Sequence, residues 1–121
     1  PEDFHGLPAF NPATGKSYAV SKLDGFSTFS AAFGATMSEI AEKNDDLAVI
    51  TAAMKCGTGL KEFAAKFPEK FYDTGIAEEH AVIFAAGLAA SGIKPVVVMY
   101  STFLQRALDC VFHDVCLQNL L

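Results

Sequence analysis

The sequence predicts an α/β fold, a three-layer sandwich built on a mostly parallel β-sheet. Short apolar segments at residues 47–51, 70–74 and 95–100 alternate with longer segments in which apolar residues recur at helical spacing. Strands that alternate with helices indicate a parallel sheet covered by helices on both faces. The 121 residues, 51% of them hydrophobic, suffice for one domain with a substantial core.

The chain is expected to divide into an interdomain linker segment, residues 1–25, and a folded domain, residues 26–121. The first segment has no sustained periodicity and is rich in Pro and Gly, which is typical of a connection. A first helix is then expected to stop near Asn44, and its apolar positions are Phe26, Phe29, Phe33, Met37 and Ile40. Because the sequence begins without Met and ends on two leucines, we expect a domain of a longer protein, truncated on its C-terminal side.

The middle of the chain predicts two strands and two helices. The apolar segment LAVIT, residues 47–51, reads as a buried strand, and the helix after it is expected to be capped by Thr58 and ended by Pro68. Residues 70–74 predict a second short strand. The segment from residue 78 to about residue 91 is almost wholly apolar, so it predicts a buried helix.

The last part of the domain predicts a third strand and a final helix. PVVVMY, residues 95–100, follows a turn marked by Gly and Pro and reads as the strand. Thr102 and Gln105 match a capping box, which would open a helix that continues to about Asn119.

Composition narrows the class of protein. Nine basic and 14 acidic residues give a net charge of −5, which argues against nucleic-acid binding. Apolar runs stop well short of the ~20 residues of a membrane span, and the acidic start does not resemble a signal peptide. Cys56, Cys110 and Cys116 lack CxxC spacing, so neither a disulfide framework nor a metal site is expected. We therefore expect a cytoplasmic protein that binds neither nucleic acid nor membrane.

The predicted strand ends indicate where a ligand would bind. In a parallel α/β sheet, ligands lie at the carboxyl ends of the strands. Those ends are residues 51–54, 73–75 and 100–102, and the candidate functional residues follow them closely.

Glu78 is the first candidate, because it places a carboxylate at the start of the apolar helix. One interpretation is a helix N-terminal carboxylate stabilised by the macrodipole. The other is a desolvated acid that holds or relays a proton. The local sequence leaves both open.

Tyr100, Phe103 and Arg106 form the second candidate group. Phe103 could be a core residue, and Tyr100 could simply end a strand. Arg106 is more informative, because a cation in the first turns of a helix opposes the macrodipole and usually has an anionic neighbour. With the free N–H groups of that helix start, it could bind phosphate.

Two motifs carry a family resemblance. FYDTGIAEEHAVIFAAGL, residues 71–88, and YSTFLQRA, residues 100–107, resemble the pyrimidine-binding domain of thiamine-diphosphate enzymes, and among them the 1-deoxy-D-xylulose-5-phosphate synthase family. The resemblance implies the thiamine-diphosphate-binding pyrimidine-domain fold. This sequence departs from the family at three positions. They are Ala52, where Pro is usual, Cys56, where an acid is usual, and Glu79, where Gln is usual.

The resemblance also implies roles for individual residues. Glu78 would hydrogen-bond N1′ of the cofactor's aminopyrimidine, and Phe103 would stack on that ring. Tyr100 and Arg106 would face the phosphorylated acceptor substrate. His5, in FHG, would contribute to the active site, although a plain loop histidine is an equal alternative.

The family's reaction would follow from the resemblance. By this resemblance, the enzyme would condense pyruvate with D-glyceraldehyde 3-phosphate and release CO2. The reaction serves isoprenoid and thiamine biosynthesis. The resemblance implies thiamine diphosphate, Mg2+ held by a diphosphate-binding domain absent from this chain, and a homodimer. The isolated 121 residues are expected to be inactive. The alternatives are another thiamine-diphosphate enzyme of the transketolase group and a catalytically silent α/β assembly domain.

Overall fold

The computed structural model describes residues 9–16, 18 and 28–120. Only part of the predicted linker, residues 1–25, falls within these ranges, and His5 lies outside them. The division of the chain at residue 26 therefore stays a prediction.

Helices and strands alternate along the described domain, as the sequence predicts. The order is α1 (Phe29–Ala41), β1 (Leu47–Thr51), α2 (Lys61–Lys66), β2 (Phe71–Asp73), α3 (Glu78–Ala90) and β3 (Lys94–Val98), with a 3-10 turn at Pro68–Lys70. The chain then continues through α4 (Ser101–Leu104), a 3-10 turn (Gln105–Ala107), α5 (Leu108–Cys110) and a π-helical segment (Val111–Cys116). Residues 101–116 are termed the last helical run below. Within the described residues, every helix falls short of the length and apolar character that a membrane span needs.

The sheet is parallel and has the strand order β2-β1-β3. Val49 of β1 lies opposite Phe71 of β2 and Val96 of β3, which sets the register of all three strands. β1 is central and buried along its whole length, which explains why its sequence is a continuous apolar run rather than an alternating one.

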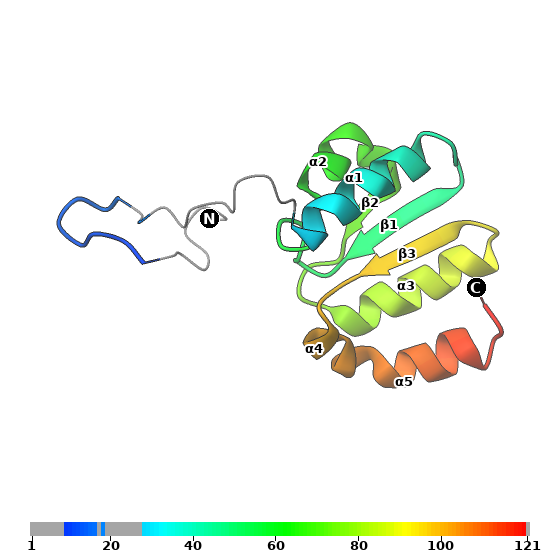
Figure 1. Cartoon of the computed structure of the whole chain (residues 1–121). Coiled ribbons are helices and arrows are strands. Elements are labelled where there is room, and N and C mark those ends of the chain that lie inside the picture. The colour runs from blue at the N-terminus through cyan, green and yellow to red at the C-terminus, as the bar shows by residue number, and fades with distance from the viewer. Residues whose placement is uncertain (1–8, 17, 19–27, 121) are drawn as a thin grey trace.

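Helices cover both faces of the sheet and complete the predicted three-layer sandwich. Figure 1 shows α1 and α2 on one face and α3 on the other, with the last helical run packed on the outer side of α3. Successive residues of β1 point to opposite faces, so Val49 joins the core beneath α1 and α2 while Ile50 joins the core beneath α3. The prediction of an α/β fold is confirmed.

Glycines let α1 pack closely on the loop that follows β1. A Cβ atom at Gly34, in the middle of α1, would lie 2.1 Å from the carbonyl oxygen of Gly59. Gly59 itself has φ +80°, and a Cβ there would lie 2.0 Å from the Ser30 carbonyl oxygen. This backbone-to-backbone contact fixes the loop of residues 52–60 beside the carboxyl end of the sheet.

Both predicted helix caps are wrong. α2 begins after Leu60, and the Thr58 hydroxyl donates instead to the Met54 carbonyl oxygen, because residues 54–58 already form their own turn. Thr102 lies inside α4, whose N-cap is Tyr100 with no side-chain capping bond. The chain turns into the helix two residues earlier than a Thr102 cap requires.

The predicted single final helix is also wrong in detail. The last helical run changes from α to 3-10 to α to π within residues 101–116. Its tight 3-10 turn buries Ala107 and brings Arg106 to the start of α3. Changes of helix type of this kind accompany packing constraints that an unbroken α-helix does not meet.

Candidate active site

The carboxyl ends of the three strands are joined by hydrogen bonds. The Thr51 hydroxyl, at the end of β1, donates to the Val98 carbonyl oxygen at the end of β3, at 2.7 Å. The Thr74 amide, just after β2, donates to the Thr51 carbonyl oxygen at 3.0 Å. The edge at which the sequence predicts ligand binding is therefore held together across all three strands.

Glu78 is buried at this edge. It is the first residue of α3, and its side chain is only 3% exposed. α3 lies between the sheet and the last helical run, and Glu78 is on its buried side with Ala81, Val82 and Ala85, whereas Glu79 and His80 are exposed. The helix start alone does not satisfy a carboxylate in such surroundings, so a partner is needed.

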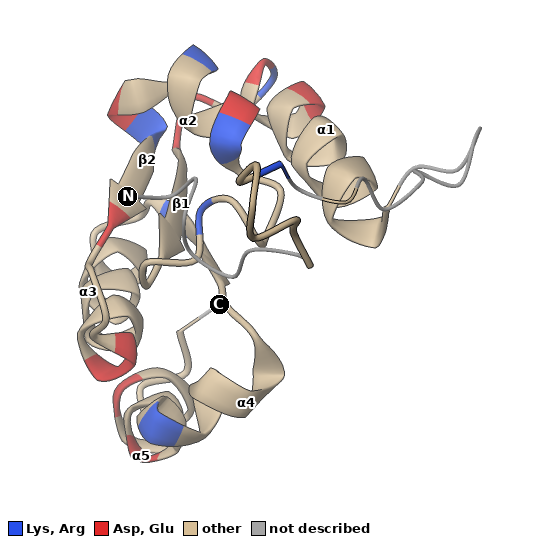
Figure 2. Ribbon diagram, turned by 90° about the vertical axis from the view of Figure 1, so that its left-hand side faces the viewer, with Lys and Arg blue, Asp and Glu red and all other residues tan. Residues whose placement is uncertain are grey.

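That partner is Arg106. Its Nη1 donates to Glu78 Oε1 at 2.5 Å, and the Arg106 side chain is 52% exposed. Figure 2 shows the acidic start of α3 close to the basic turn of the last helical run. The anionic neighbour that the sequence predicts for Arg106 is thus the other candidate residue, Glu78.

Phe103 and Tyr100 lie next to this ion pair. The Arg106 guanidinium carbon lies 5.3 Å from the centroid of the Phe103 ring, which in turn packs against the core beneath α3. The Tyr100 ring lies 6.1 Å from the Phe103 ring, between centroids, and is tilted by 37°. All four candidate residues other than His5 are therefore brought to one side of the sheet edge.

Tyr100 is held in place by the loop after β1. Its amide donates to the Met54 sulfur at 3.3 Å. Its hydroxyl lies so close to Gly57 that a Cβ atom there would be 1.7 Å away. The Gly57-Thr58-Gly59 bend thus leaves room for Tyr100.

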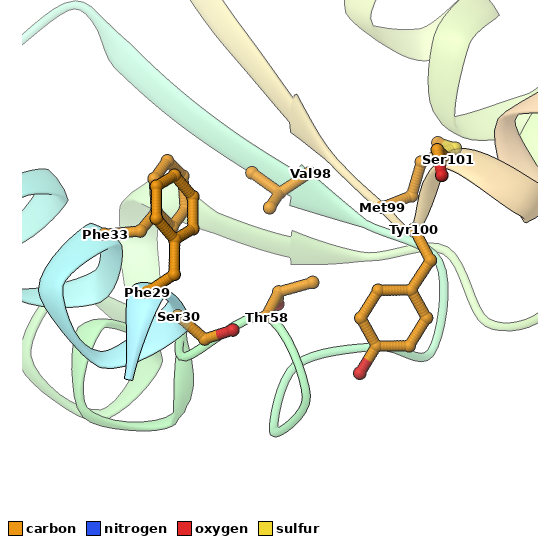
Figure 3. Close-up of a pocket in the computed structure, with 8 residues that line it drawn as sticks. All are labelled: Phe29, Ser30, Phe33, Thr58, Val98, Met99, Tyr100 and Ser101. Atoms are coloured by element: carbon orange, nitrogen blue, oxygen red, sulfur yellow. The ribbon is translucent and has the colours of Figure 1, made fainter. Parts of the chain in front are cut away.

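A pocket of about 510 Å³ is lined on one side by Tyr100. Figure 3 shows Phe29 and Phe33 on one wall, Tyr100 on the other, and the Ser30 and Thr58 hydroxyls between them. Neither Glu78 nor Arg106 lines it, so the pocket and the ion pair are separate features.

The remaining polar residues are more peripheral. His80 is exposed and stacks on Phe84, at 6.3 Å between ring centroids, and Glu79 is exposed. On the last helical run, His113 Nδ1 lies 3.0 Å from Asp114 Oδ1. Among the described residues, no three or more His, Cys, Asp or Glu side chains gather as a metal site would require.

Sequence reasoning missed Asp73. Its Oδ1 accepts the amide hydrogens of Ala53, at 2.8 Å, and of Gly75, at 3.0 Å, and so links the loops that follow β1 and β2. The spacing Asp-Thr-Gly at a strand end is the one local signal, since aspartate often bonds the amide two residues ahead. Its bond to Ala53, 20 residues away, has no local signal.

This chain is similar to known proteins along almost its whole length. The family described as transketolase, pyrimidine binding domain, matches residues 27–121. The chain is 56% identical over 120 residues to a 1-deoxy-D-xylulose-5-phosphate synthase of Geobacter sulfurreducens, covering 99% of this chain and 18% of the relative. A synthase of the same name from Natranaerobius thermophilus is 56% identical over 119 residues, covering 98% of this chain and 18% of the relative.

A solved structure shares the fold. A split-gene transketolase, titled an inactive β4 tetramer, superposes with a TM-score of 0.66 at 31% identity, over 74% of this chain and 30% of the other. The chain spans about a fifth of the length of the curated relatives, 18% in both synthases.

Proposed function

Since this chain belongs to the transketolase pyrimidine-binding domain family, we propose that it is the central domain of a 1-deoxy-D-xylulose-5-phosphate synthase. Such an enzyme condenses pyruvate with D-glyceraldehyde 3-phosphate and releases CO2. The observation that carries the proposal is the buried Glu78 carboxylate at the carboxyl edge of a parallel sheet, beside Phe103 and Arg106.

The donor set of this edge fits the aminopyrimidine of thiamine diphosphate. A buried carboxylate offers lone pairs on both oxygens, so Glu78 can accept a hydrogen bond from a protonated ring nitrogen while Oε1 receives Arg106. Phe103 offers an apolar face beside it. When bound, the cofactor supplies an electron-accepting thiazolium, which decarboxylation of a 2-oxo acid requires.

The residues of this chain would orient the cofactor ring, bind the substrate and hold a proton. Glu78 would hold the proton at N1′, and Phe103 would orient the ring. Arg106 has five N–H donors, so it can keep Glu78 with Nη1 and offer its exposed donors to the phosphate of the acceptor. Tyr100, beside Phe103, would present its hydroxyl to the same substrate.

Other parts of the proposal lie outside the described residues. We propose that another domain of the enzyme binds the diphosphate and Mg2+, that His5 reaches the active site from the segment before residue 26, and that the enzyme is a cytoplasmic homodimer. The 121 residues alone would then not turn over, because the diphosphate site is elsewhere.

The test is a chimera in which these 121 residues replace the matching segment of the Geobacter sulfurreducens synthase, which is 56% identical. The chimera should consume pyruvate only when glyceraldehyde 3-phosphate is present. Glu78→Gln removes the acid at constant size and should lower the rate ~10²–10⁴-fold. Glu79→Gln, which changes the exposed neighbour on the same helix, is the matched control and should keep the activity.

Each alternative has its own outcome in this test. Activity with a different acceptor would move the assignment to another enzyme of the transketolase group. An inactive, folded chimera would favour a silent assembly domain. Equal activity of wild type and Glu78→Gln would leave the enzyme assigned but exclude the role given to Glu78.

A further inference from the structure

Asp73 lies between the two loops that carry the proposed site. It is the last residue of β2, and a single carboxylate oxygen, Oδ1, accepts hydrogen bonds from both Ala53 and Gly75. One bond reaches the loop after β1, and the other reaches the turn that leads into α3. Asp73 therefore ties these two segments to one atom.

Both amides belong to residues in the left-handed region of backbone space. Ala53 has φ 59° and Gly75 has φ 71°. Glycine adopts this conformation readily, but alanine does so only where the surroundings compensate for the strain. The bond from the Ala53 amide to Asp73 supplies such compensation, because it holds the reversed peptide in place.

Both residues connect to the candidate site, Ala53 through its neighbour in the chain and Gly75 through a hydrogen bond. Met54 follows Ala53, and its sulfur accepts the Tyr100 amide hydrogen. On the other side, the Gly75 carbonyl oxygen accepts the Ala77 amide hydrogen at 2.8 Å, and Ala77 is the N-cap of α3, directly before Glu78.

We propose that Asp73 is a positioning residue that keeps Glu78 in a fixed relation to Met54 and Tyr100. This inference rests on the proposed function, since it assigns these residues to one active site. The required property is an acceptor oxygen at the Oδ1 position, and the negative charge is secondary. A carboxamide keeps an oxygen there, whereas a methyl group does not.

The first part of the test follows the backbone in the 121-residue chain by NMR. In Asp73→Ala, the Ala53 and Gly75 amides should exchange with solvent ~10-fold faster or more, since each loses a bond to a charged acceptor. The Met54 methyl and Glu78 amide signals should shift as well. Asp73→Asn should restore all four signals. Glu69→Ala removes an exposed carboxylate just before the same strand and should leave them unchanged.

Two results would overturn the inference. One is an Asp73→Ala chain whose Met54 and Glu78 signals stay in place. The other is an Asp73→Asn chain as disturbed as Asp73→Ala, since that would make charge, and not acceptor position, the controlling property.

The second part measures activity in the chimera described above. Asp73→Ala should lower kcat ~10–100-fold, as small misplacements of catalytic groups do, and Asp73→Asn should recover most of it. Unchanged activity in Asp73→Ala would reject the positioning role while leaving the proposed function intact. An inactive wild-type chimera would reject the proposed function, and the NMR signals of Met54 and Glu78 would still decide whether Asp73 positions them.

Discussion

Glu78 and Arg106, 28 residues apart in the sequence, form an ion pair that joins the start of α3 to the 3-10 turn of the last helical run. The Glu78 side chain is buried and the Arg106 side chain is half-exposed, so the two partners are unequal in solvation. Losing the guanidinium would leave a charge without compensation, whereas losing the carboxylate would leave a cation that water can reach.

This asymmetry predicts the result of a double-mutant cycle. Arg106→Met should lower the free energy of unfolding by ~1–2 kcal/mol, less than for a fully buried pair because Arg106 is partly solvated. Glu78→Gln should lower it less, and the two changes should be coupled. Urea unfolding of the four chains measures this coupling. The exposed pair Lys66–Glu42 is the matched control and should show near-zero coupling; equal coupling in both cycles would contradict the burial argument.

Two glycines within helices should respond oppositely to alanine. Gly34→Ala places a Cβ atom 2.1 Å from the Gly59 carbonyl oxygen, so α1 and the loop must separate. We expect a loss of ~2–4 kcal/mol in the free energy of unfolding. Gly87→Ala, in α3, meets nothing within 4 Å and should gain ~0.5–1 kcal/mol through helix propensity. Thermal unfolding of the two variants checks the sign, and a tolerated Gly34→Ala would show that the contact is not tight.

The ion pair at the start of β1 predicts an acid-dependent loss of stability. A hydrogen bond from Lys94, at 2.8 Å, holds the pKa of Asp46 below its ordinary value. A carboxylate with a lowered pKa in the folded state stabilises the fold above its unfolded pKa, and this contribution is lost as pH falls through the folded value. The free energy of unfolding should thus fall below about pH 4, where unfolded aspartate begins to bind protons. Asp46→Asn should flatten that part of the pH profile; an unchanged slope would mean that other carboxylates dominate it.

The three cysteines should differ in reactivity. Burial, followed by the neighbouring carboxylates of Asp114 and Glu79, raises the pKa of the Cys110 thiol. A smaller thiolate fraction slows alkylation. With iodoacetamide at pH 8, mass spectrometry should find Cys110 modified after the exposed Cys56 and Cys116. Raising the pH should speed the reaction at Cys110, and early modification of Cys110 would contradict its placement.

Much of the fold could be predicted because its signals are local. The LAVIT segment is apolar at every position, as a central parallel strand must be, and β1 occupies the residues predicted for it. The apolar sequence after Glu78 likewise predicts a helix, and α3 is that helix, although it is buried on one side only and Ile83 is 48% exposed. The expected anionic neighbour of Arg106 also follows from local reasoning about a cation near a helix start.

Local patterns failed where the tertiary structure offered a better partner. Thr58 matches a helix cap, yet its hydroxyl bonds Met54 within the loop that Gly34 and Gly59 press against α1. The capping box at Thr102 failed similarly, because the turn out of β3 already places Ser101 in the helix.

The sequence by itself determined the alternation of strands and helices and the grouping of candidate residues at one sheet edge, but it left open whether Glu78 is buried. Only the tertiary structure decided that Arg106 pairs with Glu78 and that Asp73 links the loops at Ala53 and Gly75. The physical reason is range. Hydrophobic periodicity involves residues a few positions apart, so it is visible in the sequence. These bonds depend instead on how α3, the last helical run and the strand ends pack together, and that packing is determined by the whole core.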